Sequence, residues 1–454
     1  MEDSGSCADA RRGGGSRSAD GEGVRLNPLA EMLNKTLSED GCPVEALLSR
    51  AGRRMYFPYG GILGQGAEAR GCEINATIGM AFEEDGSPLT LPSFEKYTRL
   101  PKSAFLYCGS SGMPELRAAW RRMQLRKNPG LEGKTFSNPI VTNALTHGLH
   151  IVAELFAEPG DAVIMPDFHW DNYDLIFGDM RGVARETFPM FAPGRRFNVS
   201  GLAERLSAPG DKKIVLLNFP NNPTGYTATA EDAAAIVETV AAAAASGKKI
   251  LCILDDAYFG LVYEDGVHGE SLFTELCDLS PDVLAVKLDG TTKEDYVWGM
   301  RVGFMAFGWR GATDAQLRAV EAKAAGAVRA SISNVSSIGQ HMALCAYAEP
   351  TFDEEKRGKY AILRARYEEI KRILAEHGEY LSAFEPMPFN SGYFMCVRPK
   401  GVDAEAVRRR LVEGYSTGTI AMSGLLRLAF STTPLGKLEK LFANVYAAIN
   451  DLRA

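Results

Sequence analysis

Two periodicities alternate along this chain, and their order predicts the fold. Short apolar runs rich in β-branched residues indicate buried strands, and stretches with helical spacing of apolar residues separate them. The predicted strands lie at 159–168, 213–220, 249–258, 283–290 and 302–308. A helix at 145–156 precedes the first strand, and an alanine-rich helix at 230–246 separates the second from the third. Strands that alternate with helices are typical of a largely parallel sheet.

Different patterns flank this central region. Before it, a helical pattern at 26–54 is followed by a short strand and a turn within 72–92. After it, an amphipathic helix at 354–376 precedes apolar runs at 393–399 and 425–431. We therefore predict an α/β fold with a second, smaller α+β unit.

These patterns predict four segments. A large domain with a mostly parallel central sheet spans 91–340, and a smaller α+β domain spans 341–454. Residues 25–90 are expected to contribute to the small domain and to the rim of the functional site. Residues 1–24 are rich in Gly, Ser and Arg and lack a hydrophobic segment, so we expect a disordered tail rather than a secretory signal.

Charge and cysteine content narrow the function classes. The formal net charge of −7 favours neither nucleic acid nor an anionic membrane as a partner. No apolar run approaches the roughly 20 residues that a membrane-spanning helix needs. The eight cysteines are scattered without a CxxC pair or a Cys/His cluster, which argues against a disulfide framework or a zinc site. We expect a cytoplasmic protein with reduced thiols.

Polar residues follow three of the predicted strands. Asn222 begins an NPTG stretch after one strand, Asp255 ends the next, and Lys293 follows a third, with Arg301 eight residues after it. Taken singly, NPTG fits a tight turn, Asp255 a helix N-cap, and Lys293 a solvated surface residue. Because ligands of open α/β sheets bind at the carboxyl ends of the strands, these residues together predict a ligand site.

Other motifs carry less weight. NPGLEGKT at 128–135 ends like a Walker A loop but has asparagine where the first glycine must stand, and the glycine cluster at 60–66 lacks the G-x-G-x-x-G order. His147, His150 and His169 have no HExxH spacing. We expect core or supporting roles for these histidines and no metal site.

A pyridoxal-phosphate (PLP) site would use such a set of strand-end residues. It needs an amine to hold the aldehyde of the cofactor as a Schiff base, and a carboxylate beside the pyridine nitrogen so that the ring acts as an electron sink. It also needs donors at the phenolic oxygen O3′, and a cradle of backbone N–H groups with an arginine for the phosphate.

The order NPTG, D-x-A-Y, lysine and arginine resembles that of the class I aminotransferases of fold type I, nearest the aspartate and aromatic group, from about residue 72 to the C-terminus. The resemblance implies that Lys293 carries the Schiff base and that Asp255 pairs with the pyridinium nitrogen. It also implies that Asn222 and Tyr258 bind O3′ and that Arg301 binds the phosphate. Lys293, Asp255 and Tyr258 would be the catalytic residues.

A second segment resembles the part of the family's site that binds the phosphate. TNALTHGL is similar to the family's strand-to-helix loop, and its phosphate contacts would come from the backbone amides of Ala144, Leu145 and Thr146. The serine usually found three residues before the lysine is a glycine here. That phosphate ligand is either missing or replaced by Thr291 or Thr292.

Two aromatic residues are assigned by resemblance. YCGSSGMPELR is similar to the segment whose tyrosine reaches the phosphate of the neighbouring subunit, which assigns Tyr107 and implies a homodimer with shared sites. PDFHWDNY is similar to the segment whose aromatic residue stacks on the pyridine ring. Trp170 is assigned to that role, with Phe168 as the alternative and core packing open for either.

The substrate contacts are also assigned by resemblance. Arg427 in LLRLAFS fits the arginine that clamps the substrate α-carboxylate, and Gly79 fits the glycine that faces the substrate. Arg329 in RASISN fits the arginine that crosses the dimer to bind a dicarboxylate side chain, while an ordinary structural role stays open. Asn222 and Trp170 would contact the substrate as well.

The resemblance predicts an aminotransferase that moves an amino group from an acidic amino acid such as aspartate, or from an aromatic one, to a 2-oxo acid such as 2-oxoglutarate. A β-eliminating lyase on the same scaffold would use the same cofactor residues, because the two reactions differ in where a proton returns and in the leaving group. A cofactor-binding regulator would need a DNA-binding segment, and residues 1–72 contain no convincing helix-turn-helix.

Overall fold

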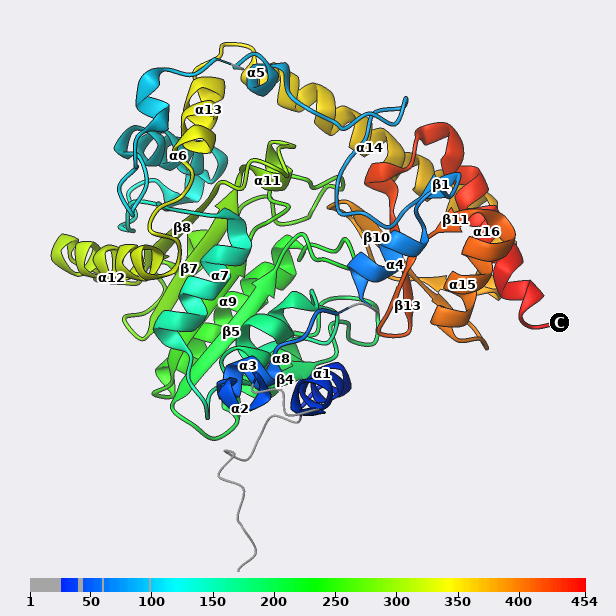
Figure 1. Ribbon diagram of the computed structural model, residues 1–454, viewed down its shortest axis with the longest axis horizontal. Coiled ribbons are helices and arrows are strands. Elements are labelled where there is room, and N and C mark those ends of the chain that lie inside the picture. The colour runs from blue at the N-terminus through cyan, green and yellow to red at the C-terminus, as the bar shows by residue number, and fades with distance from the viewer. Residues whose placement is uncertain (1–25, 40–43, 59–60, 98) are drawn as a thin grey trace, which may run out of the picture.

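The computed structural model describes residues 26–39, 44–58, 61–97 and 99–454. The predicted tail at 1–24 lies outside the described residues. Figure 1 shows a large twisted sheet with helices packed around it and a second, smaller body beside it. Among the residues described, no helix is long and apolar enough to cross a membrane.

The larger body is built on a mostly parallel sheet, as predicted. In the described part of the chain the sheet has seven strands in the order β2-β8-β7-β6-β5-β3-β4, and only β8 runs against the others. Their bounds are β2 (Ile140–Thr142), β3 (Ala162–Pro166), β4 (Ala184–Phe188), β5 (Lys212–Asn218), β6 (Lys249–Asp255), β7 (Val283–Gly290) and β8 (Gly303–Gly308).

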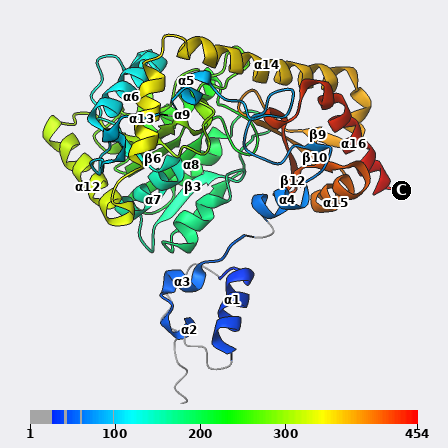
Figure 2. The same ribbon diagram turned by 45° about the horizontal axis from the view of Figure 1, so that its top comes forward.

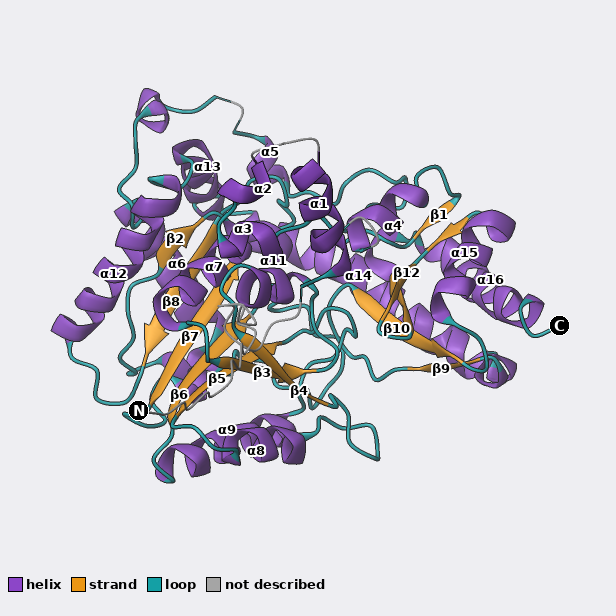
Figure 3. Ribbon diagram, turned by 60° about the horizontal axis from the view of Figure 1, so that its bottom comes forward, coloured by secondary structure: helices purple, strands orange, loops and turns teal. Residues whose placement is uncertain are grey.

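The central strands are mostly apolar because helices cover both faces of the sheet. After their first residue, β5 and β6 are buried throughout. Figure 3 shows α8 and α9 on one side of the sheet and α7 and α12 on the other. The covering helices are α6 (Pro114–Lys127), α7 (Ala144–Phe156), α8 (Val199–Ser207), α9 (Ala230–Ala245), α10 (Phe273–Leu276), α11 (Thr291–Glu294) and α12 (Asp314–Ile332).

The sequence pattern did not reveal the edge strand β4. Its residues Ala184 and Arg185 are exposed, and β3 is its one neighbour in the sheet order. An edge strand does not need a continuous apolar run, because it buries less of its surface than a central strand.

The smaller body contains an antiparallel sheet of four strands in the order β12-β13-β10-β9, among the residues described. A short parallel pair, β1 with β11, joins the N-terminal segment to this body. The bounds are β1 (Ile74–Asn75), β9 (Phe384–Pro386), β10 (Phe394–Pro399), β11 (Thr417–Gly418), β12 (Ile420–Met422) and β13 (Leu425–Ala429), with α4 (Ile62–Glu68), α15 (Ala404–Tyr415) and α16 (Leu438–Asp451).

One long helix, α14 (Phe352–Glu376), leads from the larger body to the smaller one (Figures 1 and 2). It begins beside α5 (Pro92–Glu95) and α13 (Ser337–Tyr347) and ends beside α16. The N-terminal helices lie together on the side of the molecule away from α14 (Figure 2). They are α1 (Pro28–Ser38), α2 (Val44–Leu47) and α3 (Arg50–Arg54). The chain therefore crosses between the two bodies more than once.

Candidate active site

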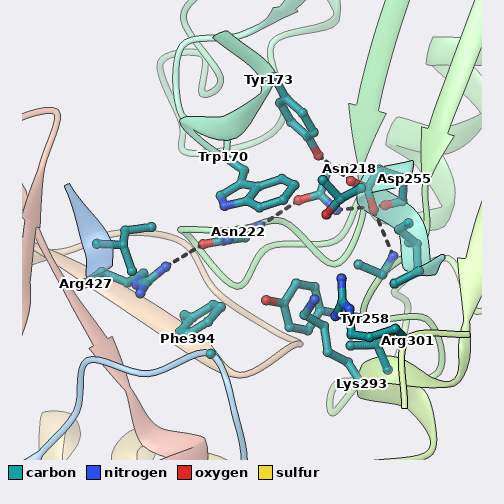
Figure 4. Close-up of a pocket in the computed structure, with 17 residues that line it drawn as sticks. Trp170, Tyr173, Asn218, Asn222, Asp255, Tyr258, Lys293, Arg301, Phe394 and Arg427 are labelled. Carbon is teal, nitrogen blue, oxygen red and sulfur yellow. Dashed lines mark hydrogen bonds between the residues drawn. The ribbon is translucent and has the colours of Figure 1, made fainter. Parts of the chain in front are cut away.

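A cavity of about 200 Å³ opens where β5, β6 and β7 end and the smaller sheet approaches them. Figure 4 shows side chains from both bodies pointing into it. All predicted cofactor and substrate residues except Tyr107 and Arg329 line it. They are Gly79, Ala144, Leu145, Thr146, Trp170, Asn222, Asp255, Tyr258, Thr292, Lys293, Arg301 and Arg427.

Lys293 lies in the short helix α11 that follows β7, and it points into the cavity rather than into bulk water (Figure 4). Its Nζ lies 5.1 Å from the centre of the Tyr258 ring. Burial lowers the pKa of Lys293 to about 8, nearby Asp255 opposes this effect, and Arg301 adds to it. A larger fraction of this amine is therefore neutral and nucleophilic near neutral pH than of an ordinary lysine.

Buried ion pairs fix the backbone that carries Lys293. Glu294 accepts hydrogen bonds from Lys127 Nζ at 2.7 and 2.9 Å, and Asp295 accepts one from Lys356 Nζ at 2.8 Å. Tyr393 Oη donates to the carbonyl oxygen of Lys293 at 2.9 Å. The two residues after the lysine are thus anchored to α6 and α14.

Asp255 ends β6 and is almost fully buried. Its Oδ2 accepts a hydrogen bond from Tyr173 Oη at 2.6 Å, and its Oδ1 accepts one from the Ala257 backbone N–H at 3.1 Å. Burial raises the pKa of Asp255, while the Tyr173 hydrogen bond and the charge of Lys293 hold it down. The sequence reading missed Tyr173, although it lies in the PDFHWDNY segment already singled out for Trp170.

Asn218 is a second residue that the sequence reading missed. It ends β5, and its Nδ2 donates to the carbonyl oxygen of Asp255 at 2.7 Å. Its Oδ1 accepts the backbone N–H of Asn222 at 2.8 Å. Asn218 therefore fixes the positions of two predicted cofactor residues relative to each other. Its place at a strand end was the available signal.

The NPTG turn is held against the smaller body. Gly225 has φ +72°, and a Cβ there would lie 1.9 Å from the carbonyl oxygen of Phe394, so no other residue fits without a shift. The Gly225 carbonyl oxygen accepts the backbone N–H groups of Asn390 and Ser391, both at 2.9 Å. This close approach brings Asn222 to the end of the smaller sheet.

Arg427 projects from β13 of the smaller sheet into the cavity, and its side chain is almost completely buried. Its Nη1 donates to Asn222 Oδ1 at 2.9 Å and its Nη2 to the Thr77 carbonyl oxygen at 2.8 Å, while the guanidinium lies over the ring of Phe394 (Figure 4). Its Nε has no hydrogen-bond partner. Burial lowers the pKa of Arg427, and the charge of Asp171 opposes this effect. A buried cation with an unpartnered donor favours an anionic ligand.

The opposite end of the cavity gathers donors suited to a phosphate. Ala144 begins α7 with φ +59°, and Ala144, Leu145 and Thr146 line the cavity, so the start of this helix, whose first amides have no partner within the helix, lies at the cavity wall. Thr292 Oγ1 is buried without a hydrogen-bond partner, whereas Thr291 Oγ1 donates to the Val302 carbonyl oxygen at 3.0 Å. Of the two threonines, Thr292 is the one that faces the cavity. Arg301 completes this end.

Comparison with known proteins decides the family. The profile described as aminotransferase class I and II matches residues 92–445. The chain belongs to this family. It is 26% identical over 300 residues to aspartate aminotransferase from Geobacillus stearothermophilus, covering 65% of this chain and 66% of that protein. It is 28% identical over 192 residues to a probable N-succinyldiaminopimelate aminotransferase of Mycobacterium tuberculosis, covering 42% and 46% of the two chains.

The match to these curated aminotransferases thus spans between about half and two thirds of their length. A crystal structure of an aminotransferase from Anaerococcus prevotii superposes with a TM-score of 0.79, covering 89% of this chain and 99% of that one at 20% sequence identity. This similarity shows that the fold is that of fold type I, as predicted.

Class I aminotransferases use PLP, and the cavity of this family member fits that cofactor. Lys293 would hold its aldehyde and Asp255 its ring nitrogen, while Asn222 and Tyr258 would hold its phenolic oxygen. The unpartnered hydroxyl of Thr292 and the amides at the start of α7 suit the phosphate. Each charged or hydrogen-bonding part of the cofactor would thus have a complementary group in the cavity.

The structure distinguishes the two aromatic candidates for stacking. Trp170 lines the cavity, whereas Phe168 packs in the core beside Phe191, with 6.4 Å between ring centres. Tyr107 and Arg329 lie outside the cavity of their own chain. Tyr107 is 93% exposed, and Arg329 Nη1 donates to Ser333 Oγ at 2.6 Å.

Proposed function

We propose that this protein is a PLP-dependent aminotransferase that transfers the amino group of an α-amino acid to a 2-oxo acid. The supporting observation is the convergence of Lys293, Asp255 and Arg427 on one cavity from three separate elements, α11, the end of β6 and β13. Family membership supports the same conclusion, because aminotransferases give the family its name.

Each residue has a separate task in this reaction. When bound, the cofactor supplies an electron sink for the electron pair released as the substrate Cα–H bond breaks. Asp255, whose pKa the Tyr173 hydrogen bond holds down, would hold a proton on the ring nitrogen. Lys293 would hold the aldehyde and would be the base for the Cα proton. Arg427 holds the α-carboxylate so that Cα faces Lys293.

The proposed donors are acidic amino acids such as aspartate, or aromatic ones, and the proposed acceptor is 2-oxoglutarate. The name of the Geobacillus stearothermophilus relative supports aspartate as a candidate donor. Ile62, Trp170 and Phe394 give the cavity an apolar wall that suits an aromatic side chain. Arg329 would supply the cation for a second carboxylate from the partner subunit.

We further propose a homodimer with shared sites, located in the cytoplasm. Phe105, Leu106 and Tyr107 form an exposed run with 73, 68 and 93% of their surfaces accessible, which suits burial against a second copy. Ser110 Oγ donates to the Ser333 carbonyl oxygen at 2.8 Å, so the segments of Tyr107 and Arg329 lie side by side and would cross together. The cysteines of the described residues are all free thiols, which supports a reducing compartment.

The test is to mix the purified holoprotein with a panel of amino acids and 2-oxoglutarate and to measure glutamate. We expect transfer from at least one acidic or aromatic donor, and its loss in Lys293→Ala together with the absorption band of the lysine-bound cofactor. Release of ammonia and pyruvate without exchange of amino groups would show a lyase instead. A fully active Lys293→Ala variant would refute the assignment.

A further inference from the structure

Residues 77–82 of the N-terminal segment cross the cavity and are referred to below as the strap. At its first residue, the Thr77 carbonyl oxygen accepts the hydrogen bond from Arg427 Nη2. In its middle, Gly79 lines the cavity, and a Cβ there would lie 3.8 Å from the hydroxyl of Tyr258. The strap therefore binds the proposed carboxylate-binding arginine and passes near a proposed cofactor residue.

The other end of the strap is bound by a buried arginine of α14. The guanidinium of Arg366 is fully buried, and its Nη2 donates to the Phe82 carbonyl oxygen at 2.7 Å. Its Nη1 donates to the Ser431 carbonyl oxygen at 2.6 Å, and its Nη2 also pairs with Glu84 Oε1 at 2.7 Å. Ser431 follows β13, the strand that carries Arg427. Arg366 thus joins the strap to the end of that strand.

The same helix also contacts the segment of the proposed catalytic amine. Near its start, Lys356 Nζ donates to Glu294 Oε1 at 3.0 Å and to Asp295 Oδ1 at 2.8 Å, directly after Lys293. Figure 1 shows α14 running from beside α5 and α13 on the larger body to the smaller body. One rigid element therefore holds both sides of the site at a fixed separation.

We propose that Arg366 is a positioning residue for substrate binding: it fixes the strap against the end of β13, so that Arg427 and Gly79 are aligned on the substrate α-carboxylate. This inference rests on the proposed function, because it assigns Arg427 to a carboxylate. Arg366 itself does not line the cavity. Its effect passes through the backbone of the strap and through β13.

The contacts predict loosening of the strap rather than unfolding when Arg366 is replaced. The backbone N–H of Phe82 donates to the Ser431 carbonyl oxygen at 3.0 Å, and Ser431 Oγ donates to the Met80 carbonyl oxygen. Both bonds remain without the guanidinium. Glu84 is half exposed, so its carboxylate can return to water. Misplacement of a binding group by about 1 Å costs up to about a hundredfold in rate.

The experiment compares Arg366→Met and Arg366→Lys with the wild-type holoenzyme. Because every substrate carries an α-carboxylate, we expect KM to rise about tenfold for both the amino donor and the 2-oxo acid in Arg366→Met, with kcat changed less than about threefold. The cofactor absorption band should be unchanged. Arg366→Lys should recover part of the loss, since it restores the charge and one donor.

The matched control is Arg121→Met. Arg121 Nη1 also donates to two backbone carbonyl oxygens, those of Phe136 and Ser137, at 3.1 and 2.8 Å, and it lies away from the cavity. Its KM values should match the wild type. An unchanged KM in Arg366→Met, an equal rise in Arg121→Met, or a loss confined to cofactor binding would each overturn the inference.

A binding measurement separates this inference from the proposed function. Calorimetric titration with 2-oxoglutarate requires no turnover, and hydrogen exchange of the Phe82 amide reports on the strap directly. If the wild type binds the 2-oxo acid without transferring amino groups, the proposed function fails. In that case weaker binding and faster exchange in Arg366→Met still support the positioning role. Equal binding or equal exchange in the two proteins overturns that role whatever the reaction is.

Discussion

Replacing Tyr173 with phenylalanine removes a single hydroxyl from the site and tests whether that hydroxyl holds down the pKa of Asp255. The lost hydrogen bond is short, at 2.6 Å, and both partners are almost fully buried. A hydrogen bond to a charged group contributes about 1.5–3 kcal/mol. Because a factor of ten corresponds to about 1.4 kcal/mol, the carboxyl should be protonated about ten to about a hundred times more readily in the variant.

The sign of the pH effect follows from this loss. Burial already raises the pKa of Asp255, and the Tyr173 hydrogen bond lowers it, so removing the hydroxyl raises the pKa further. As the pH falls, the variant takes up its proton earlier than the wild type. We therefore expect the acid limb of the kcat/KM profile for amino transfer to move to higher pH, with little change on the alkaline side.

The matched control is Tyr226→Phe. Tyr226 Oη donates to Asp232 Oδ2 at 2.8 Å in the core, outside the cavity. The Tyr226→Phe variant loses the same kind of buried hydrogen bond, and its kcat/KM profile should keep the acid limb of the wild type. If Tyr173→Phe also keeps that limb, the hydroxyl does not control the ionisation of Asp255 and the reasoning fails.

Three further predictions follow from the geometry. The pKa of Lys293 is lowered to about 8, so capture of PLP by the apoprotein should accelerate as the pH rises and level off above about 8. Stopped-flow absorbance measures this rate, and a rate independent of pH would contradict the prediction. Thr292→Ala should weaken cofactor binding about fivefold, because a lost hydrogen bond costs about 1 kcal/mol, and Thr292→Ser should restore the binding. Equal cofactor affinities of the wild type and Thr292→Ala in titrations would exclude a phosphate contact. Gly225→Ala should lower the free energy of unfolding by more than about 3 kcal/mol, because its Cβ would overlap the Phe394 carbonyl oxygen; a denaturation midpoint like that of the wild type would refute the clash.

The sequence by itself determined the fold class and the family, and it singled out the polar residues near the strand ends that the structure brings to one cavity. Central strands such as β5 and β6 are recognisable because burial on both faces requires a continuous apolar run. Asn222, Asp255 and Lys293 are recognisable because each ends such a run or lies within a few residues after it. These signals depend on residues that are close together in the sequence, so they can be recognised without the structure.

Only the tertiary structure decided which neighbours control those residues. Tyr173 lies 82 residues from Asp255 and Arg366 lies 284 residues from Phe82, so no local spacing links either pair. Packing of distant elements creates these contacts, and in the sequence Tyr173 is indistinguishable from a core aromatic. The choice between Thr291 and Thr292 is of the same kind. Adjacent residues of a helix point in different directions, and the way α11 packs on the sheet decides which hydroxyl reaches the cavity.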